Sequence, residues 1–96
     1  MAAGAVYAGY SVAVANGAFV DTAPINPAEA VIHNIYHGGT VELYWYDGVH
    51  TMLLDAQTGP GVYDFHAFHV NSSFRIYIKN ISGAAIDIGW DGMYTA

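Results

Sequence analysis

The chain has 96 residues and a mass of 10.3 kDa, which fits one domain and leaves no room for a second. Hydrophobic residues make up 54% and charged residues 10%, where about 25% charged is typical, so an intrinsically disordered chain is excluded. Two cations against eight acids give a net charge of −6. Nucleic acids and anionic membrane surfaces are bound by several clustered cations, so neither is expected as a partner.

A domain this small has a large surface for its volume, and charged side chains normally cover much of it. This chain carries only ten charged side chains. We therefore expect part of its surface to be covered by copies of the same chain or by a larger assembly. The alternative is a monomer whose surface is made polar by Ser, Thr, Asn, Tyr and Gly.

Residues 1–28 are expected to form an N-terminal arm or hairpin followed by a linker. The Asn-Gly dipeptide at 16–17 is a strong hairpin signal, and a two-residue turn there would place Val14 opposite Phe19. Two prolines that follow cannot donate ladder hydrogen bonds and so indicate a linker. Residues 29–96 are expected to form the body of what remains a single domain.

Turn signals recur about every 8–12 residues along the body, which is typical of a sandwich or barrel. An Asp-Gly turn at 47–48 would pair Trp45 with His50, and alternation from residue 74 directs Phe74, Ile76 and Ile78 inward. The expected strands of the body are 29–36, 40–46, 49–54, 62–70, 74–79 and 84–88. With the N-terminal strands, about eight strands predict an all-β, antiparallel, jelly-roll-like β-sandwich.

Aromatic residues are the strongest remaining signal, at 14 of 96. Tyrosine buries apolar area and keeps a hydroxyl group for hydrogen bonding, so it suits both protein interfaces and sugar stacking. We expect the first 20 residues to add a strand to a neighbouring sheet. The candidate interface residues are Val6, Tyr7, Tyr10, Val12, Phe19, Tyr44 and Tyr46.

Four histidines raise the question of a metal site. On a strand, His33 and His37 would share a face but lie roughly 13 Å apart, whereas His66 and His69 would point to opposite faces. The chain has no cysteine to complete a site, so no metal ligand is assigned, although these histidines could still converge from different strands.

Catalytic patterns are missing from the sequence. Four of the aspartates lie in or near expected turns, where Asp is common because its side chain bonds to nearby backbone. Ser72, Ser73 and Ser82 are expected in turns, and no serine occupies a nucleophile elbow. We expect neither an enzyme nor a cofactor.

Several segments of residues 29–94 resemble a group of small all-β virion proteins of tailed bacteriophages. These segments are Val31-Ile-His-Asn-Ile-Tyr36, Val41-Glu-Leu-Tyr44, Tyr46-Asp-Gly48, residues 58–61, residues 74–83 and Ile88-Gly-Trp-Asp-Gly92. The resemblance implies a structural role in the virion: a capsid decoration (cement) protein, or a neck or tail component. It further implies self-association, with trimers favoured, and binding to the major capsid protein at the capsid surface. It implies no catalytic residue.

A carbohydrate-binding module is the alternative, because lectins share the jelly-roll architecture. Such a module would use Tyr44, Tyr46 or Trp90 as a stacking platform, with turn aspartates bound to sugar hydroxyls.

Overall fold

The computed structural model describes residues 3–64 and 66–96, and within them the chain forms nine strands in two antiparallel sheets. The first sheet contains β1 (Val6–Val14), β9 (Ile86–Tyr94), β3 (Ala30–His37) and β6 (Gly61–Tyr63), and β7 (Phe68–Val70) also pairs with β3. The second sheet contains β2 (Phe19–Asp21), β8 (Arg75–Asn80), β4 (Val41–Tyr46) and β5 (Thr51–Gln57). The expected all-β antiparallel sandwich is confirmed. No helix in the described ranges has the length and apolar character that crossing a membrane requires.

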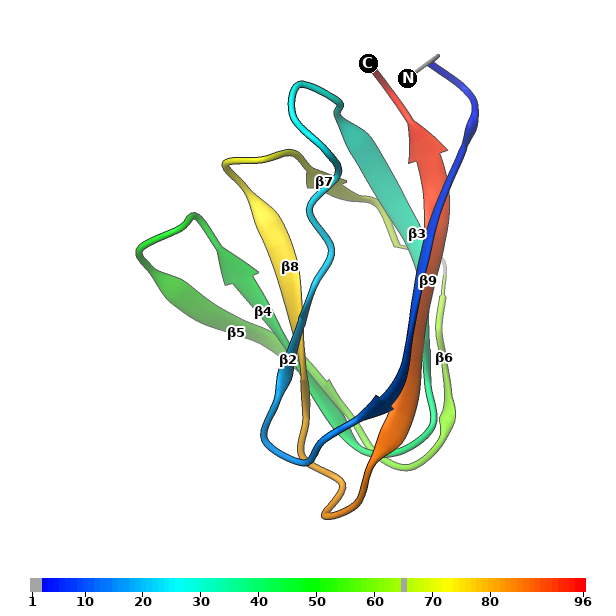
Figure 1. Ribbon diagram of the computed structural model, residues 1–96, viewed down its shortest axis with the longest axis vertical. Helices are drawn as coiled ribbons and strands as arrows, with labels where there is room; N and C mark the ends of the chain where they lie inside the picture. Colours follow the sequence, from blue (N-terminus) through cyan, green and yellow to red (C-terminus); the bar gives the residue numbers. More distant parts are fainter. Residues whose placement is uncertain (1–2, 65) are drawn as a thin grey trace.

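The core lies between the two sheets, which face each other in Figure 1. Alternation along β8 directs Ile76 and Ile78 inward, as predicted from the sequence. Phe74 is an exception, because it precedes the first residue of β8 and lies half exposed against Trp45, with 5.9 Å between the ring centroids. The largest fully buried apolar side chains come from both sheets: Ile32, Ile35, Leu43, Ile78, Ile88 and Val41.

The N-terminal segment is part of both sheets, so the expected hairpin pairing is wrong. Val14 lies opposite Ile86 and Phe19 lies opposite Lys79, because β1 pairs with β9 and β2 pairs with β8. The Asn16-Gly17 turn carries the chain from one sheet to the other, with Gly17 at a φ of 84°. Burial of Val14 in the core between the sheets favours this crossing over a two-stranded arm.

The register of the β4–β5 hairpin also differs from the prediction. Trp45 pairs with Met52 instead of His50, because the turn contains four residues and the Asp47 amide donates to the His50 carbonyl over 3.3 Å. Farther along, a register shift leaves Leu54 without a partner on β4, which marks a β-bulge on this strand.

Two glycine–aromatic pairs fix the register between β1 and β9. Gly9 lies opposite Trp90 and Gly89 lies opposite Tyr10. A Cβ atom on Gly9 would overlap the Trp90 indole, and one on Gly89 would lie 2.9 Å from Cδ2 of Tyr10. Each ring therefore covers backbone that only glycine leaves free.

Buried polar groups hold the two sheets together. The Asn80 side chain, fully buried at the end of β8, donates from Nδ2 to the Val14 carbonyl over 2.8 Å and to the Ala84 carbonyl over 2.7 Å. Its Oδ1 accepts from the backbone and hydroxyl of Ser82. In the same way, the Tyr7 hydroxyl of the first sheet donates to the Thr22 carbonyl beside the second. Through its bonds to Val14, Ala84 and Ser82, the buried Asn80 side chain has hydrogen-bond partners for both its nitrogen and its oxygen.

Replacing Asn80 with alanine should lower the free energy of unfolding by about 3 kcal/mol, because buried carbonyls would lose their donors. Urea unfolding followed by circular dichroism measures the change. Asn16→Ala is the matched control, since the exposed Asn16 side chain accepts one hydrogen bond from the Gly83 amide, and it should cost about 1 kcal/mol or less. Equal losses for the two variants would contradict this role for Asn80.

Candidate functional site

The outer side of the second sheet carries a cluster of aromatic rings that we term the aromatic face. It consists of Phe19, Tyr44, Tyr46 and Tyr77, from β2, β4 and β8. Tyr44 and Tyr77 are cross-strand partners, so their side chains share one side of the sheet. The ring centroids of Tyr46 and Tyr77 are 4.4 Å apart, and the Phe19 centroid lies 5.7 Å from that of Tyr44 and 5.4 Å from that of Tyr77. The rings thus form one continuous apolar surface.

Both cations of the chain lie among these rings. The Arg75 guanidinium is 5.1 Å from the Tyr46 centroid and pairs with Asp21 at 3.6 Å, while the Lys79 ammonium is 5.5 Å from the Phe19 centroid. Such cation–aromatic contacts keep the charge at the protein surface while the stem of the side chain packs. The Tyr44 hydroxyl donates to Glu42, and this hydrogen bond raises the pKa of Tyr44.

Strand β5 continues the second sheet beyond the aromatic face and ends it as an edge strand. Six of its seven residues are exposed, among them the consecutive apolar residues Met52, Leu53 and Leu54. Figure 1 shows the β4–β5 hairpin turned away from the first sheet, which explains why this strand remains uncovered. Leu53 pairs with Tyr44 and therefore extends the aromatic face to the sheet edge.

The outer side of the first sheet has a different chemistry. Here the Tyr10 hydroxyl donates to Asp87 over 2.6 Å and the Tyr36 hydroxyl donates to Asp91 over 2.6 Å. Tyr10 and Tyr36 are both partners of Gly89 on β9, so they lie on the same side of the sheet. We term this surface the tyrosine–aspartate face. The hydrogen bond from Tyr10 lowers the pKa of Asp87, and the hydrogen bond to Asp91 raises the pKa of Tyr36.

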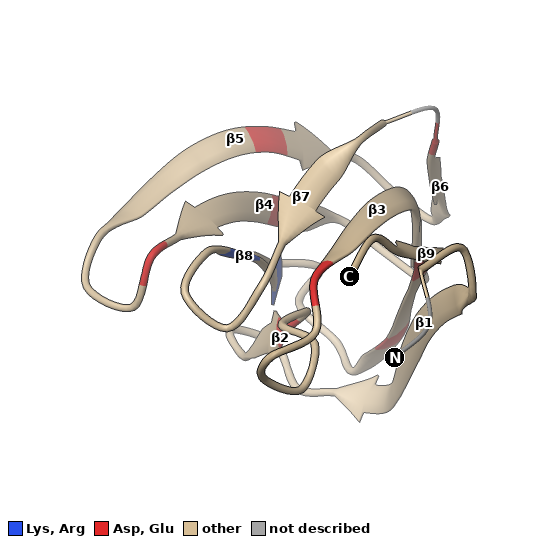
Figure 2. Ribbon diagram, turned by 90° about the horizontal axis from the view of Figure 1, so that it is seen from above, with Lys and Arg blue, Asp and Glu red and all other residues tan. Residues whose placement is uncertain are grey.

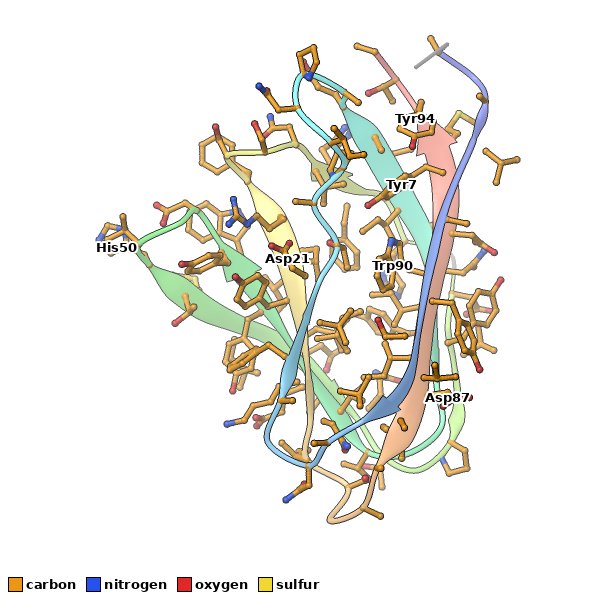
Figure 3. The ribbon with its side chains drawn as sticks, in the orientation of Figure 1. Tyr7, Asp21, His50, Asp87, Trp90 and Tyr94 are labelled. Carbon is orange, nitrogen blue, oxygen red and sulfur yellow. The ribbon has the colours of Figure 1, made fainter. Side chains whose placement is uncertain are left out.

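The side chains predicted as interface residues separate onto these two faces. Val6, Tyr10 and Val12 are exposed on β1, whereas Phe19, Tyr44 and Tyr46 belong to the aromatic face. Tyr7 is a correction, because alternation along β1 points it into the core, where it is only 5% exposed (Figure 3). Tyr77 belongs to the aromatic face without being among the predicted interface residues, although alternation between Arg75 and Lys79 predicts that its side chain points outward.

Trp90 was a predicted sugar platform and is unsuited to that role. Its indole is 8% exposed and lies between the sheets against Gly9, as Figure 3 shows for the labelled ring. Alternation along β9 places Trp90 on the side opposite Asp87.

The rings of His33 and His37 form hydrogen bonds with backbone carbonyls. His33 Nδ1 lies 2.9 Å from the His66 carbonyl, and the buried His37 donates from Nδ1 to the Gly39 carbonyl over 3.1 Å. His69 is exposed on β7. Among residues 3–64 and 66–96, no three His, Asp or Glu side chains are gathered so that they could hold a metal ion.

No protein-family model matches the chain, and a search of curated proteins finds no similar sequence. The two outer faces and the open edge of β5 are therefore the features of the molecule that bear on its function.

The β4–β5 turn next to this edge should be acid-sensitive. Asp47 accepts hydrogen bonds from the backbone amides of His50 and Val49 and from the His50 ring, and these lower its pKa from 3.8 to about 2. A carboxyl group whose pKa falls on folding stabilises the protein above its unfolded pKa, and this contribution is lost as the pH falls towards 2. NMR titration of Asp47, with urea unfolding between pH 5 and pH 2, measures both effects.

The variant Asp47→Asn should be less stable than the parent at pH 5 and should lose less stability between pH 4 and pH 2. Glu29→Gln is the control, because the Glu29 side chain has no hydrogen bond among the described residues, and it should follow the parent. If Asp47→Asn lost as much unfolding free energy between pH 4 and pH 2 as the parent, the Asp47 carboxylate would not be the source of the acid sensitivity.

Proposed function

We propose that this protein is a non-enzymatic structural subunit of a tailed-phage virion, a capsid decoration protein that binds copies of itself and the major capsid protein. The observation that carries the proposal is strand β5, an exposed sheet edge with three consecutive apolar side chains. The sequence resemblance across residues 29–94 supplies the virion context, and it applies equally to a neck or tail position.

Open strand edges promote association between chains, because their unpaired backbone groups accept a further strand. Proteins that remain monomeric commonly protect such edges with charged side chains, particularly lysine, or with proline. Here β5 carries a single charge, that of Asp55, and no proline. Its composition suits a strand that is covered in an assembly.

The aromatic face supports the same conclusion. Tyrosine and arginine are enriched in protein interfaces, where they combine apolar contact area with hydrogen bonds. Tyr44, Tyr46, Tyr77 and Arg75 lie together beside the open edge, and Leu53 joins the two surfaces. One partner could therefore contact both.

A carbohydrate-binding module is less well supported by the same surface. Tyr46 has Tyr77 stacked on it and the Arg75 guanidinium over its ring, and Tyr44 packs against Phe19. Trp90 is buried. Sugar stacking requires an aromatic ring face that is open to solvent, and neighbouring side chains occupy the rings predicted for it.

If β5 is an assembly edge, Leu53→Lys should weaken self-association while leaving the fold intact, because Leu53 is 53% exposed and outside the core. Light scattering behind size exclusion, at two protein concentrations, should give an oligomer for the parent chain and a mass near 10.3 kDa for the variant.

Val49→Lys is the matched control. Val49 is 80% exposed in the same hairpin, and the substitution adds the same charge beyond the end of the strand, so the oligomer should persist. A parent chain that is monomeric at both concentrations would contradict the proposed function. Equal effects of the two variants would contradict the role of β5.

A further inference from the structure

We infer that a second copy of this chain covers the aromatic face with its own tyrosine–aspartate face, in a head-to-tail contact. The inference deepens the proposed function and rests on it, because it names the two surfaces through which the subunits would associate.

The distribution of charge carries the argument. Arg75 and Lys79, the only two cations, both lie on β8, and Asp21 and Glu42 beside them balance their charge. The other six acids, which account for the net charge of −6, lie outside the aromatic face. Figure 2 shows this separation, with the cations confined to β8 and acids on other elements. A second, negatively charged copy would therefore be repelled least at the aromatic face, where its carboxylates could also approach Arg75 and Lys79.

The alternative pairings of the two faces are less favourable. Two tyrosine–aspartate faces in contact would bring Asp87 and Asp91 of one copy against the same carboxylates of the next, with no cation between them. Two aromatic faces would bring together surfaces whose cations, Lys79 and Arg75, already have the acids Asp21 and Glu42 beside them, so this pairing leaves Asp87 and Asp91 without a cation. The unlike pairing brings Asp87 and Asp91, which form no ion pair within the described part of their own copy, near the cations of the next.

Apolar side chains are available on both surfaces to accompany this charge pairing. Phe19 and Leu53 are exposed at the aromatic face, and Tyr10 is 65% exposed on the opposite side. Other exposed apolar side chains at the first sheet are Val6, Tyr36, Val62 and Met93. Apolar contacts could thus surround the paired charges, which lie on the inner strands β8 and β9.

The geometry sets the symmetry of the assembly. Asp87 and the aromatic face lie on opposite outer sides of the sandwich, so each copy would use two different surfaces. A contact between unlike surfaces is heterologous, and it closes into a ring or continues as an open stack. It does not produce a two-fold dimer.

Charge reversal tests the contact. Lys79→Glu reverses one of the two positive charges of the aromatic face, and Asp87→Lys reverses one of the two carboxylate charges of the other face. Each variant should weaken self-association of the full chain about ten-fold in sedimentation equilibrium. An equimolar mixture of the two variants should recover most of the parent association, because each altered face then meets a face of opposite charge. Circular dichroism verifies that both variants fold.

Control variants distinguish the loss of this contact from the effect of a changed net charge on self-association. Glu29→Lys changes the net charge as Asp87→Lys does, and the double variant Thr58→Glu, Ser73→Glu changes it as Lys79→Glu does, all at exposed positions outside both faces. Neither control should weaken association more than two-fold. If Asp87→Lys does not fold, Asp91→Asn removes a charge from the same face, keeps an acceptor for the Tyr36 hydroxyl at the expense of the one that accepts from Asn34 Nδ2, and should weaken association about three-fold.

The outcomes distinguish the two levels of the proposal. A parent chain that does not associate would overturn the proposed function and this inference together. If the parent chain associates but the variants associate as well as their controls, or if the mixture does not recover association, the face-to-face contact alone is overturned. The edge of β5 would then be the remaining candidate for self-association.

Discussion

The closed end of the sandwich depends on one buried amide, that of Asn80. Its side chain holds the end of β1 through the Val14 carbonyl and the β8–β9 turn through Ala84 and Ser82. The backbone of the same residue bonds to the β1–β2 turn, with the Gly17 amide donating to its carbonyl over 2.7 Å. Because a buried polar group is costly unless it is satisfied, this network specifies one arrangement of both turns and hence the way the chain crosses between the sheets.

The opposite end of the second sheet, where Tyr46 pairs with Arg75, carries the exposed β4–β5 hairpin. The β4–β5 hairpin of the second sheet turns away from the first sheet. Strand β5 therefore pairs only with β4, and the first sheet does not cover its side chains. Met52, which pairs with Trp45 on the inner side of the second sheet and would be buried in a longer sandwich, then faces solvent. The surface that supports the proposed function is therefore a direct result of how this small core is closed.

Much of the fold could be predicted from local patterns. Alternation gave the inward Ile76 and Ile78 of β8, and turn spacing gave the all-β class. The pairing of strands within the sheets was predicted less well. The turn signalled by Asn16-Gly17 forms, with the Ala18 amide donating to the Ala15 carbonyl, yet burial of Val14 between the sheets directs the strands on either side of the turn into different sheets. The Asp47 carboxylate, by bonding to its own turn, lengthens the β4–β5 connection and shifts its register.

By itself, the sequence determined the scarcity of charge, the abundance of tyrosine and the β-class of the fold, because these follow from composition and period. Only the tertiary structure decided which tyrosines are accessible. Tyr7 and Tyr10 lie three residues apart on β1, and alternation sends one into the core and the other to the surface once the strand has been placed. Pairing of distant strands likewise collects both cations on one face and leaves Asp87 and Asp91 on the other, since sheet neighbours are chosen by packing and not by sequence order.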